Sequence, residues 1–275
     1  MLQTYDATTG TAMPKTGGAA WLALRTVRNL RKGLAWAWLD TVCQYRRSKI
    51  GPLWETINVL VMTLCMTVVS AAVIGGSVTN LVPYIGLGII IWSAITALVL
   101  DGSMTFVRNR DYILATNLSI DYYVARTMFR ALIAFGHHLV LYFIGVAVGL
   151  VTLHWVALLA IPGMLLLFAT GYWVVTLSAL IVARFRDVEL IIRNLLQLAF
   201  FATPVFWDYR QVPKSRAFIV DYNVVFYFIE IVRAPLLGEV PPLRHYLVVL
   251  TVTVIGFALA YAAYRRLRRR LAFFV

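Results

Sequence analysis

The chain has 275 residues, of which 61% are hydrophobic and only 13% are charged, and its mean hydropathy is +0.80. A soluble domain carries about 25% charged residues, so this composition predicts an integral membrane protein. It excludes a disordered chain, a collagen and a disulfide scaffold. The net charge of +13 would suggest nucleic acid in a soluble protein, but here it first raises the question of membrane sidedness.

The first 20 residues are polar and rich in Gly and Thr, and they lack the apolar core of a signal peptide. We expect them to form a flexible cytoplasmic tail. In residues 21–52 apolar side chains recur at helical spacing and basic side chains lie between them. This pattern predicts an amphipathic helix that lies in the membrane interface. It could serve as a membrane-surface anchor or as a docking helix for a soluble partner.

Six apolar stretches between residues 53 and 265 are each long enough for a membrane-spanning helix of about 20 residues. They predict an all-α fold whose spans cover 53–74, 84–106, 123–150, 156–182, 188–207 and 247–264. Thr203-Pro204 should end the helix of the fifth span. Residues 207–243 are too polar to cross the membrane and too apolar for a plain loop. We therefore expect short re-entrant helices there, which form an outer gate.

Six spans place both termini on one side of the membrane, and the charges decide which side that is. The side with the termini carries 20 of the 25 Lys and Arg residues and eight acids, whereas the other side carries five bases and four acids. The positive-inside rule predicts that both termini are cytoplasmic, with residues 266–275 as a basic end. Because topology accounts for the excess charge, we expect no nucleic-acid partner.

The sequence lacks the common catalytic signatures. It contains no G-x-x-x-x-G-K-[ST], GxSxG or HExxH motif and no CxxC, so we expect neither ATP binding nor a catalytic or metal site in this chain. Asp187-x-Glu189 could be a metal pair, but its neighbouring arginines favour simple charge neutralisation. His137 and His138 lie within a span and could relay protons or bond a neighbouring helix. A permease driven by another chain is the economical interpretation.

Four further segments stand out along the chain. They are Tyr45-Arg46-Arg47-Ser48-Lys49-Ile50-Gly51-Pro52-Leu53-Trp54, Ala183-Arg184-Phe185-Arg186-Asp187-Val188, the stretch 196–207 with its Thr203-Pro204-Val205, and Glu230-x-x-Arg233-x-x-Leu236-Leu237-Gly238. These segments resemble motifs in the permease subunits of ABC-2 type polysaccharide exporters, particularly the O-antigen and teichoic-acid group. Their order and spacing match over about residues 21–265. Gln44 replaces the first Arg of the entry motif and Asn223-Val224 replaces Asn-Pro, which leaves the subfamily and the sugar open.

The resemblance implies a homodimer in a bacterial inner membrane that binds two copies of a separate ABC ATPase. The pair would export a lipid-linked glycan, such as the O-antigen of lipopolysaccharide biosynthesis. ATP and Mg would be held by the ATPase, and this chain would hold no cofactor. Residues 53–265 would form the permease domain, with residues 207–243 as its outer gate.

The resemblance also assigns roles to particular side chains. Those expected to couple to the ATPase are Arg25, Arg28, Arg108, Arg110, Asp111, Arg186 and Asp187. Those at which a diphosphate headgroup could enter, unless they only anchor the membrane, are Arg46, Arg47 and Lys49. Those along the glycan path, or in an ordinary interfacial belt, are Phe200, Phe201, Phe206, Trp207, Tyr209, Tyr222 and Tyr227. The outer basic residues, which could meet a lipid diphosphate or outer headgroups, are Arg210, Lys214 and Arg216.

Two other functions remain open at this point. One is an ABC-2 drug or lipid exporter of the same architecture. The other, of a different class, is a membrane enzyme that processes polyprenyl phosphate. Such an enzyme would need acids clustered on one loop, whereas the expected outer acids are scattered, at Asp208, Asp221, Glu230 and Glu239.

Overall fold

The computed structural model describes residues 18–46, 48–51, 53–73, 75–116, 120–211, 213–216 and 218–267, without the side chains of residues 18–30 and of Lys214. Most of the predicted tail 1–20 and of the basic end 266–275 therefore lies outside the described residues. Within the described ranges, every regular element is a helix. The all-α prediction is confirmed for this part of the chain.

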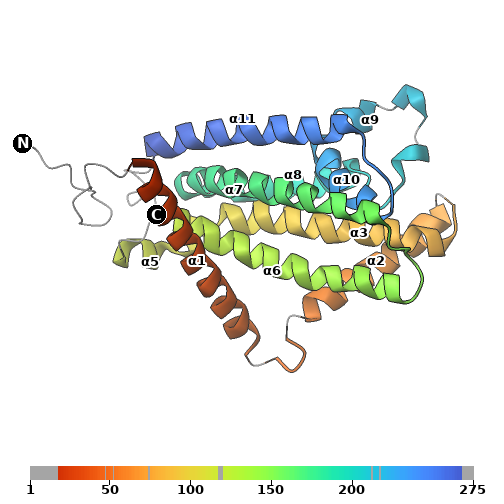
Figure 1. The fold of residues 1–275 in the computed structure, drawn as a ribbon, viewed down its shortest axis with the longest axis horizontal. Helices are drawn as coiled ribbons and strands as arrows, with labels where there is room; N and C mark the ends of the chain where they lie inside the picture. Colours follow the sequence, from red (N-terminus) through yellow and green to blue (C-terminus); the bar gives the residue numbers. More distant parts are fainter. Residues whose placement is uncertain are drawn as a thin grey trace, which may run out of the picture.

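Among the residues that the structure describes, five helices are long and apolar enough to cross a membrane. They are α2 (Leu53–Val73), α3 (Val78–Thr96) with its π-helical continuation η1 (Ala97–Asp101), α6 (Ile120–Ala147), α7 (Ala160–Arg184) preceded by the 3₁₀ turn η2 (Trp155–Leu159), and α11 (Leu243–Leu267). Helices α3, α6, α7 and α11 run along one another (Figure 1). These helices make the chain a multi-pass membrane protein by length and composition.

The second of these helices begins earlier than the sequence suggested. We expected the span to start near residue 84, but α3 starts at Val78 and contains Pro83 in its second turn. The backbone N–H groups of Asn80 and Leu81 both bond to the carbonyl of Ser77, which closes the first turn ahead of the proline. The predicted break between the third and fourth spans is confirmed, since α6 ends at Ala147 and Gly149 turns the chain with a φ of 78°.

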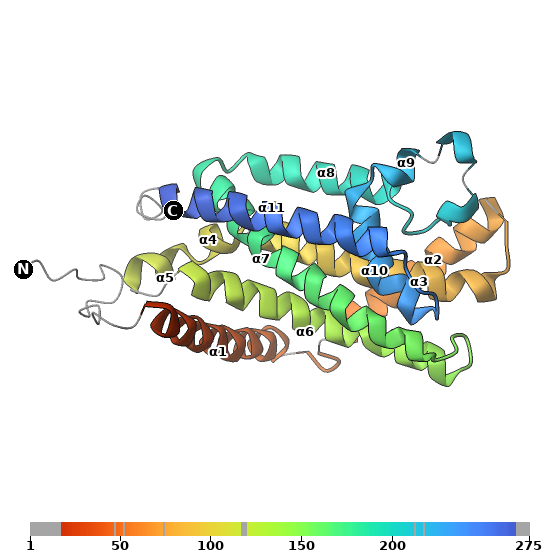
Figure 2. The same ribbon diagram turned by 45° about the horizontal axis from the view of Figure 1, so that its top comes forward.

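Helix α8 (Val188–Ala202) covers most of the expected fifth span but is only 15 residues long. At 1.5 Å per residue it measures roughly 22 Å, less than the ~30 Å of a bilayer core. It ends as expected before Pro204, where Thr203 adopts an extended conformation. None of its residues is buried; it contacts η1 and α7 and lies on the outside of the bundle (Figure 2).

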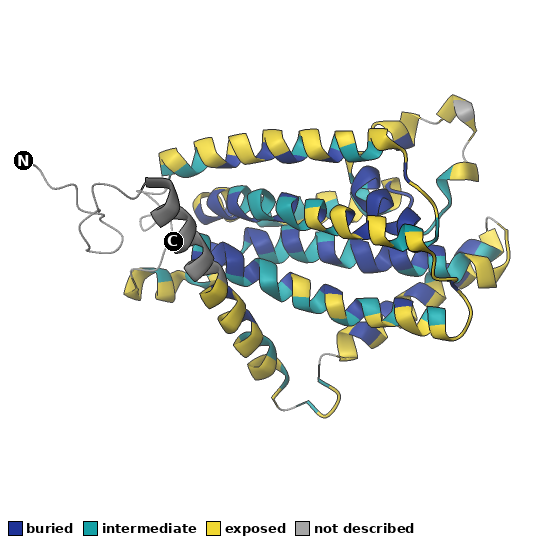
Figure 3. Cartoon of the chain, in the orientation of Figure 1, coloured by how far each residue is buried: buried dark blue, intermediate teal, exposed yellow. Residues whose placement is uncertain are grey.

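The expected gate region contains one deeply packed helix. After the short elements η3 (Tyr209–Gln211), η4 (Lys214–Arg216) and α9 (Phe218–Asp221), helix α10 (Val224–Leu236) packs against α3, α7 and α11. Every residue from Phe226 to Leu236 is buried, and Figure 3 shows the helix as the dark centre of one end of the bundle. Gly163 of α7 permits this contact, because a Cβ there would lie 2.4 Å from the carbonyl oxygen of Ile231.

The short helices α4 (Thr105–Arg108) and α5 (Arg110–Ala115) connect η1 to α6. They lie at the same end of the bundle as the α7–α8 turn and the last residues of α11, opposite α9 and α10 (Figures 1 and 2). The first helix, α1 (Gly18–Tyr45), crosses the bundle obliquely and packs against α6. The charged connections are thereby gathered at one end.

Candidate functional site

Helix α1 approaches α6 through small residues. A Cβ on Gly33 would lie 2.9 Å from the Cβ of Ala125, and Ala37, one turn further along α1, is fully buried. The larger apolar residues that predicted the amphipathic character, such as Leu34 and Trp38, are exposed in this chain. Helix α1 therefore packs on α6 through its small residues and leaves its larger apolar side chains exposed.

Arg126 of α6 joins three elements at this contact. Its Nε and Nη2 donate to the two carboxylate oxygens of Asp40 in α1, at 2.6 and 2.7 Å. Its Nη1 donates to Oδ1 of Asn109, the residue between α4 and α5, at 2.8 Å. The guanidinium also lies 5.7 Å from the ring centroid of Trp36. A bidentate pair of this kind fixes orientation as well as distance.

The five predicted coupling residues whose side chains the structure describes are exposed at the end of the bundle with α4 and α5. Arg108 donates to Asp101 at 2.7 Å, while Arg110 and Asp111 are exposed on α5. Arg186 and Asp187 are exposed in the α7–α8 turn at the same end of the bundle. The side chains of Arg25 and Arg28, on α1, lie outside the described part of the structure.

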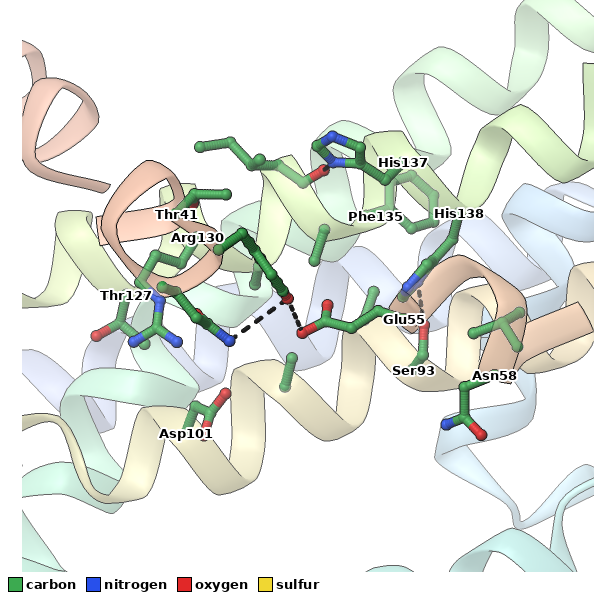
Figure 4. A pocket seen from close by; sticks show the side chains of 18 residues that line it. Thr41, Glu55, Asn58, Ser93, Asp101, Thr127, Arg130, Phe135, His137 and His138 are labelled. Carbon is green, nitrogen blue, oxygen red and sulfur yellow. Dashed lines mark hydrogen bonds between the residues drawn. The ribbon is translucent and has the colours of Figure 1, made fainter. Parts of the chain in front are cut away.

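A polar cavity of about 250 Å³ opens between the end of α1, the start of α2, η1 with the end of α3, and the first half of α6 (Figure 4). Its titratable lining residues are Tyr45, Glu55, Asp101, Arg130, His137 and His138. The Tyr45 hydroxyl donates to Glu55 and accepts from Gln44. Burial, together with that bond to Glu55, raises the pKa of Tyr45 to about 12, so the phenol stays protonated at physiological pH.

Two of the three predicted headgroup-entry residues lie beside this cavity and are not among its described lining residues. Arg46 and Lys49 are exposed in the α1–α2 connection, directly after the cavity residue Tyr45. Arg47 lies outside the described residues. The polar groups that the structure gathers here are Glu55 and Arg130, which had no role in our sequence-based assignment.

The turn at residues 203–207 is held by three helices at the opposite end. The carbonyl oxygen of Pro204 accepts a hydrogen bond from Nη1 of Arg233 at 2.8 Å, and that of Phe206 accepts one from Ser70 of α2 at 2.6 Å. Gly88 of α3 makes room for the turn, since a Cβ there would lie 2.7 Å from the carbonyl oxygen of Val205. Two of the sequence segments quoted above, 29 residues apart, thus form one hydrogen-bonded unit.

Arg233 is completely buried, and its main partner is also on α10. Its Nε and Nη2 both donate to Oε2 of Glu230, at 3.1 and 2.7 Å, and Glu230 is only 2% exposed. The guanidinium carbon lies 3.9 Å from the ring centroid of Tyr84 in α3. All three nitrogens are therefore paired, which is how a buried charge is tolerated.

The predicted glycan-path aromatics fall into two clusters and one isolated residue. Phe200 and Phe206 stack at 5.4 Å between ring centroids, Phe201 packs on both, and the indole N–H of Trp207 donates to the carbonyl of Phe201. Tyr209 and Tyr227 instead each pack edge-on against Phe226, which is buried in α10. Tyr222 is 85% exposed and joins neither cluster within the described residues.

The predicted outer basic residues surround the same end. Arg210 forms an ion pair with Glu239, and Arg216 is exposed. The side chain of Lys214 lies outside the description. In the part of the chain that the structure describes, no three His, Cys, Asp or Glu residues come together in a group that could hold a metal ion.

The structure combines a bundle of helices long enough to span a membrane with the buried helix α10 at one end and exposed charged connections at the other. A comparison with family models identifies the family to which such a chain belongs. The model described as ABC-2 type transporter matches residues 34–237, well over half of the chain. The chain belongs to the ABC-2 type transporter family. ABC-2 domains are permease components of ABC transporters, generally not catalytic themselves, and they generally work with ABC ATPases. A search of curated proteins found no match for this ABC-2 chain.

Sequence reasoning missed most of the groups that the structure brings together in this ABC-2 chain. Asp40, Arg126 and Asn109 come from three elements, and only the single acid in the otherwise basic stretch 21–49 hinted at a pair. Glu55 and Arg130 carried a weak signal too, as charges near the ends of apolar stretches.

Proposed function

We propose that this chain is the permease subunit of an ATP-driven exporter of a lipid-linked polysaccharide. The observation that carries the proposal is the hydrogen bond from Arg233 to the carbonyl of Pro204. It links the Thr-Pro-Val and Glu-x-x-Arg segments, two of the four motifs that resemble those of polysaccharide exporters. Because this hydrogen bond joins the two segments, one structural contact accounts for the presence of both motifs in the chain.

The membrane arrangement belongs to the same proposal. Helix α8 serves as a short fifth span, so the five long helices and α8 make six, and α9 and α10 form the outer gate. Both termini are cytoplasmic, in a bacterial inner membrane, because the end with α4, α5 and the α7–α8 turn carries most of the basic residues. A helix shorter than the bilayer core is accommodated by local thinning of the membrane or by association with a second helix.

The glycan would pass between two copies of the permease. Helix α8 presents exposed apolar side chains along its length, including Leu195, Leu198 and Phe201, and it has no buried residue in the single chain. Such a face suits a homodimer whose aromatic cluster, Phe200 with Phe206 and Trp207, lines the outer part of the path. The C–H faces of sugars stack on such rings. Arg210, Lys214 and Arg216 would meet the lipid diphosphate as it leaves.

At the cytoplasmic end, two copies of an ABC ATPase would dock on the exposed connections. Arg108, Arg110 and Asp111 on one connection and Arg186 and Asp187 on the other offer the mixed charges that a protein contact uses. The ATPase would hold ATP and Mg. Arg46 and Lys49 would receive the diphosphate headgroup near the interface helix.

The experiment that tests the export function is depletion of this chain in its native cell, followed by mass spectrometry of extracted polyprenyl-linked lipids. We expect a lipid-linked glycan to accumulate while the same glycan disappears from the cell surface. Re-expression of the natural chain should reverse both changes. A Phe200→Ala, Phe206→Ala double variant should restore them only in part, because it removes the stacked pair.

Phe143→Ala is the matched control, since Phe143 is an exposed ring on the surface of α6, away from the proposed path. It should restore export fully. An unchanged lipid-linked pool and an unchanged surface would contradict glycan export and would favour a drug or lipid exporter. Turnover of polyprenyl phosphate by the purified chain alone would contradict a transporter altogether.

A further inference from the structure

The polar cavity contains two opposite charges that do not pair with each other. Glu55 and Arg130 both line it, yet they form no ion pair. One oxygen of Glu55 accepts from Tyr45, and Arg130 has no hydrogen bond or ion pair within the part of the chain that the structure describes. Asp101, the other lining acid, is already paired with Arg108. Glu55 is exposed and Arg130 is half-buried, so both charges are open to a molecule that enters the cavity and supplies partners for each of them.

The cavity also offers hydrogen-bond acceptors that lack donors. Ser93 Oγ has one hydrogen and donates it to the carbonyl of Ile90 at 2.7 Å, so it accepts from Nδ1 of His138 at 3.0 Å. In the neutral imidazole Nε2 is then a bare acceptor, and this atom is buried without a partner among the described residues. Nδ1 of His137 donates to the carbonyl of Ile133 at 2.8 Å, so Nε2 is the acceptor nitrogen of its neutral imidazole as well.

These groups lie where the helices end. Tyr45 is the last residue of α1, Glu55 is in the first turn of α2, and Asp101 is the last residue of η1. Exposed apolar side chains occupy the ends of the same two helices, with Trp38 and Val42 on α1 and Trp54 on α2. A polar cavity flanked by apolar side chains at the helix ends fits the headgroup of a lipid whose acyl chains lie against α1 and α2.

We propose that the cavity between α1, α2, η1 and α6 binds the phosphate–ammonium headgroup of a phosphatidylethanolamine molecule. The phosphate is bound by Arg130, and the ammonium group donates its hydrogens to Glu55 and to Nε2 of His138. The cavity volume of about 250 Å³ equals roughly eight waters at ~30 Å³ each, which leaves room for both groups. This site is separate from the glycan path and independent of the exported substrate.

The lining also selects against other headgroups. A phosphatidylglycerol headgroup brings a negative charge without a cation, and it would leave Glu55 unpaired beside a second carboxylate, Asp101. A phosphatidylcholine headgroup carries a cation without N–H groups, so it cannot donate to Nε2 of His138. A polyprenyl diphosphate adds further negative charge to a cavity that has only one unpaired cation.

The test is native mass spectrometry of the detergent-solubilised full chain, titrated with the three phospholipids carrying identical acyl chains. We expect phosphatidylethanolamine to bind about tenfold more tightly than either other lipid, the effect of one charged hydrogen bond of ~1.5 kcal/mol. Comparable binding of all three lipids, or preferred binding of phosphatidylglycerol, would overturn the proposal. This comparison uses the unaltered chain and does not depend on the folding of any variant.

Variants test whether the preference for phosphatidylethanolamine arises at this cavity, and a soluble probe tests whether the bound headgroup comes from a lipid. Glu55→Gln and Arg130→Gln should each abolish it, whereas Glu189→Gln and Arg193→Gln should retain it, because these last two form an exposed ion pair on α8. Retention of the preference in Glu55→Gln would overturn the assignment. O-phosphoethanolamine should bind at least tenfold more weakly than the lipid; equal affinity would overturn the lipid as the source and indicate a soluble ligand.

Discussion

Arg233 shows how a single side chain can organise one end of a membrane protein. Desolvation of a guanidinium and a carboxylate costs several kcal/mol per ion, and this cost must be offset by complete pairing. Here Glu230, the carbonyl of Pro204 and the ring of Tyr84 provide that pairing from three different segments. Lysine could not replace arginine in this role, because it has no planar fork that reaches two partners at once.

We therefore expect Arg233→Gln to destabilise the protein by about 3–5 kcal/mol, because Glu230 is left buried without its cation. The apparent melting temperature of the detergent-solubilised chain, read by fluorescence-detected size-exclusion chromatography, should fall by roughly 10 °C. Arg244→Gln is the control, since its pair with Asp221 is exposed at both partners and spans 3.6 Å, and it should change little.

The double variant Glu230→Gln, Arg233→Gln separates pairing from packing. It removes both charges and should recover part of the lost stability. A double variant less stable than Arg233→Gln alone would mean that the contacts to Pro204 and Tyr84, not the ion pair, dominate the role of Arg233.

At the scale of elements, α1 is attached to the bundle by a contact between small residues and by the ion pair between Asp40 and Arg126. Gly33 and Ala37 permit close approach, and Asp40 with Arg126 fixes the register. Arg126 also donates to Asn109. A movement of Asn109, which lies between α4 and α5, can therefore displace Arg126 and, with it, Asp40 of α1. In an ABC-2 permease that arrangement suits the transfer of movement from an ATPase to the interface helix.

We expect Asp40→Ala to leave the chain in the membrane and bound to its ATPase, but to lower export per ATP hydrolysed by about tenfold. The lost bidentate pair amounts to ~1.5–3 kcal/mol. The measurement is coupled transport and ATP hydrolysis in proteoliposomes that contain both subunits. The exchange Asp40→Arg, Arg126→Asp should regain part of the coupling. Full coupling in Asp40→Ala would show that the Asp40–Arg126 ion pair does not transmit movement from the ATPase.

The elements could be predicted from the sequence far better than these contacts. Hydropathy located all five long helices, and Thr203-Pro204 located the end of α8, because both signals are local. The contact face of α1 gave no signal, since glycine and alanine neither raise nor lower an amphipathic pattern. The polar cavity was also missed, because its lining residues come from four separate elements, and the histidines that the sequence did single out, His137 and His138, gave no sign of their partners.

At the scale of the whole molecule, the two ends of the bundle differ in packing. The connections with α4, α5 and the α7–α8 turn lie at one end, whereas the buried helix α10 and the turn at residues 203–207 lie at the other. Helix α8 connects the two ends and, at 15 residues, is the shortest of the proposed spans. The proposed topology therefore depends on whether this short helix crosses the membrane.

Cysteine labelling can decide that question. In a chain with Cys43→Ser and Cys65→Ser, positions Arg186 and Arg216 flank α8 and are both exposed. We expect a membrane-impermeant maleimide to label Arg216→Cys in spheroplasts but to label Arg186→Cys only after the membrane is opened. Labelling of both positions from the same side would show that α8 does not cross.

The deep placement of α10 also has a consequence for how the protein is made. Two of its packing partners, α3 and α7, precede it in the chain, together with the turn that Arg233 binds. Helix α11 follows α10 and packs over both α7 and α10. Packing of α11 thus completes the burial of α10, and a chain truncated before α11 would leave the helix with the Glu230–Arg233 pair partly uncovered.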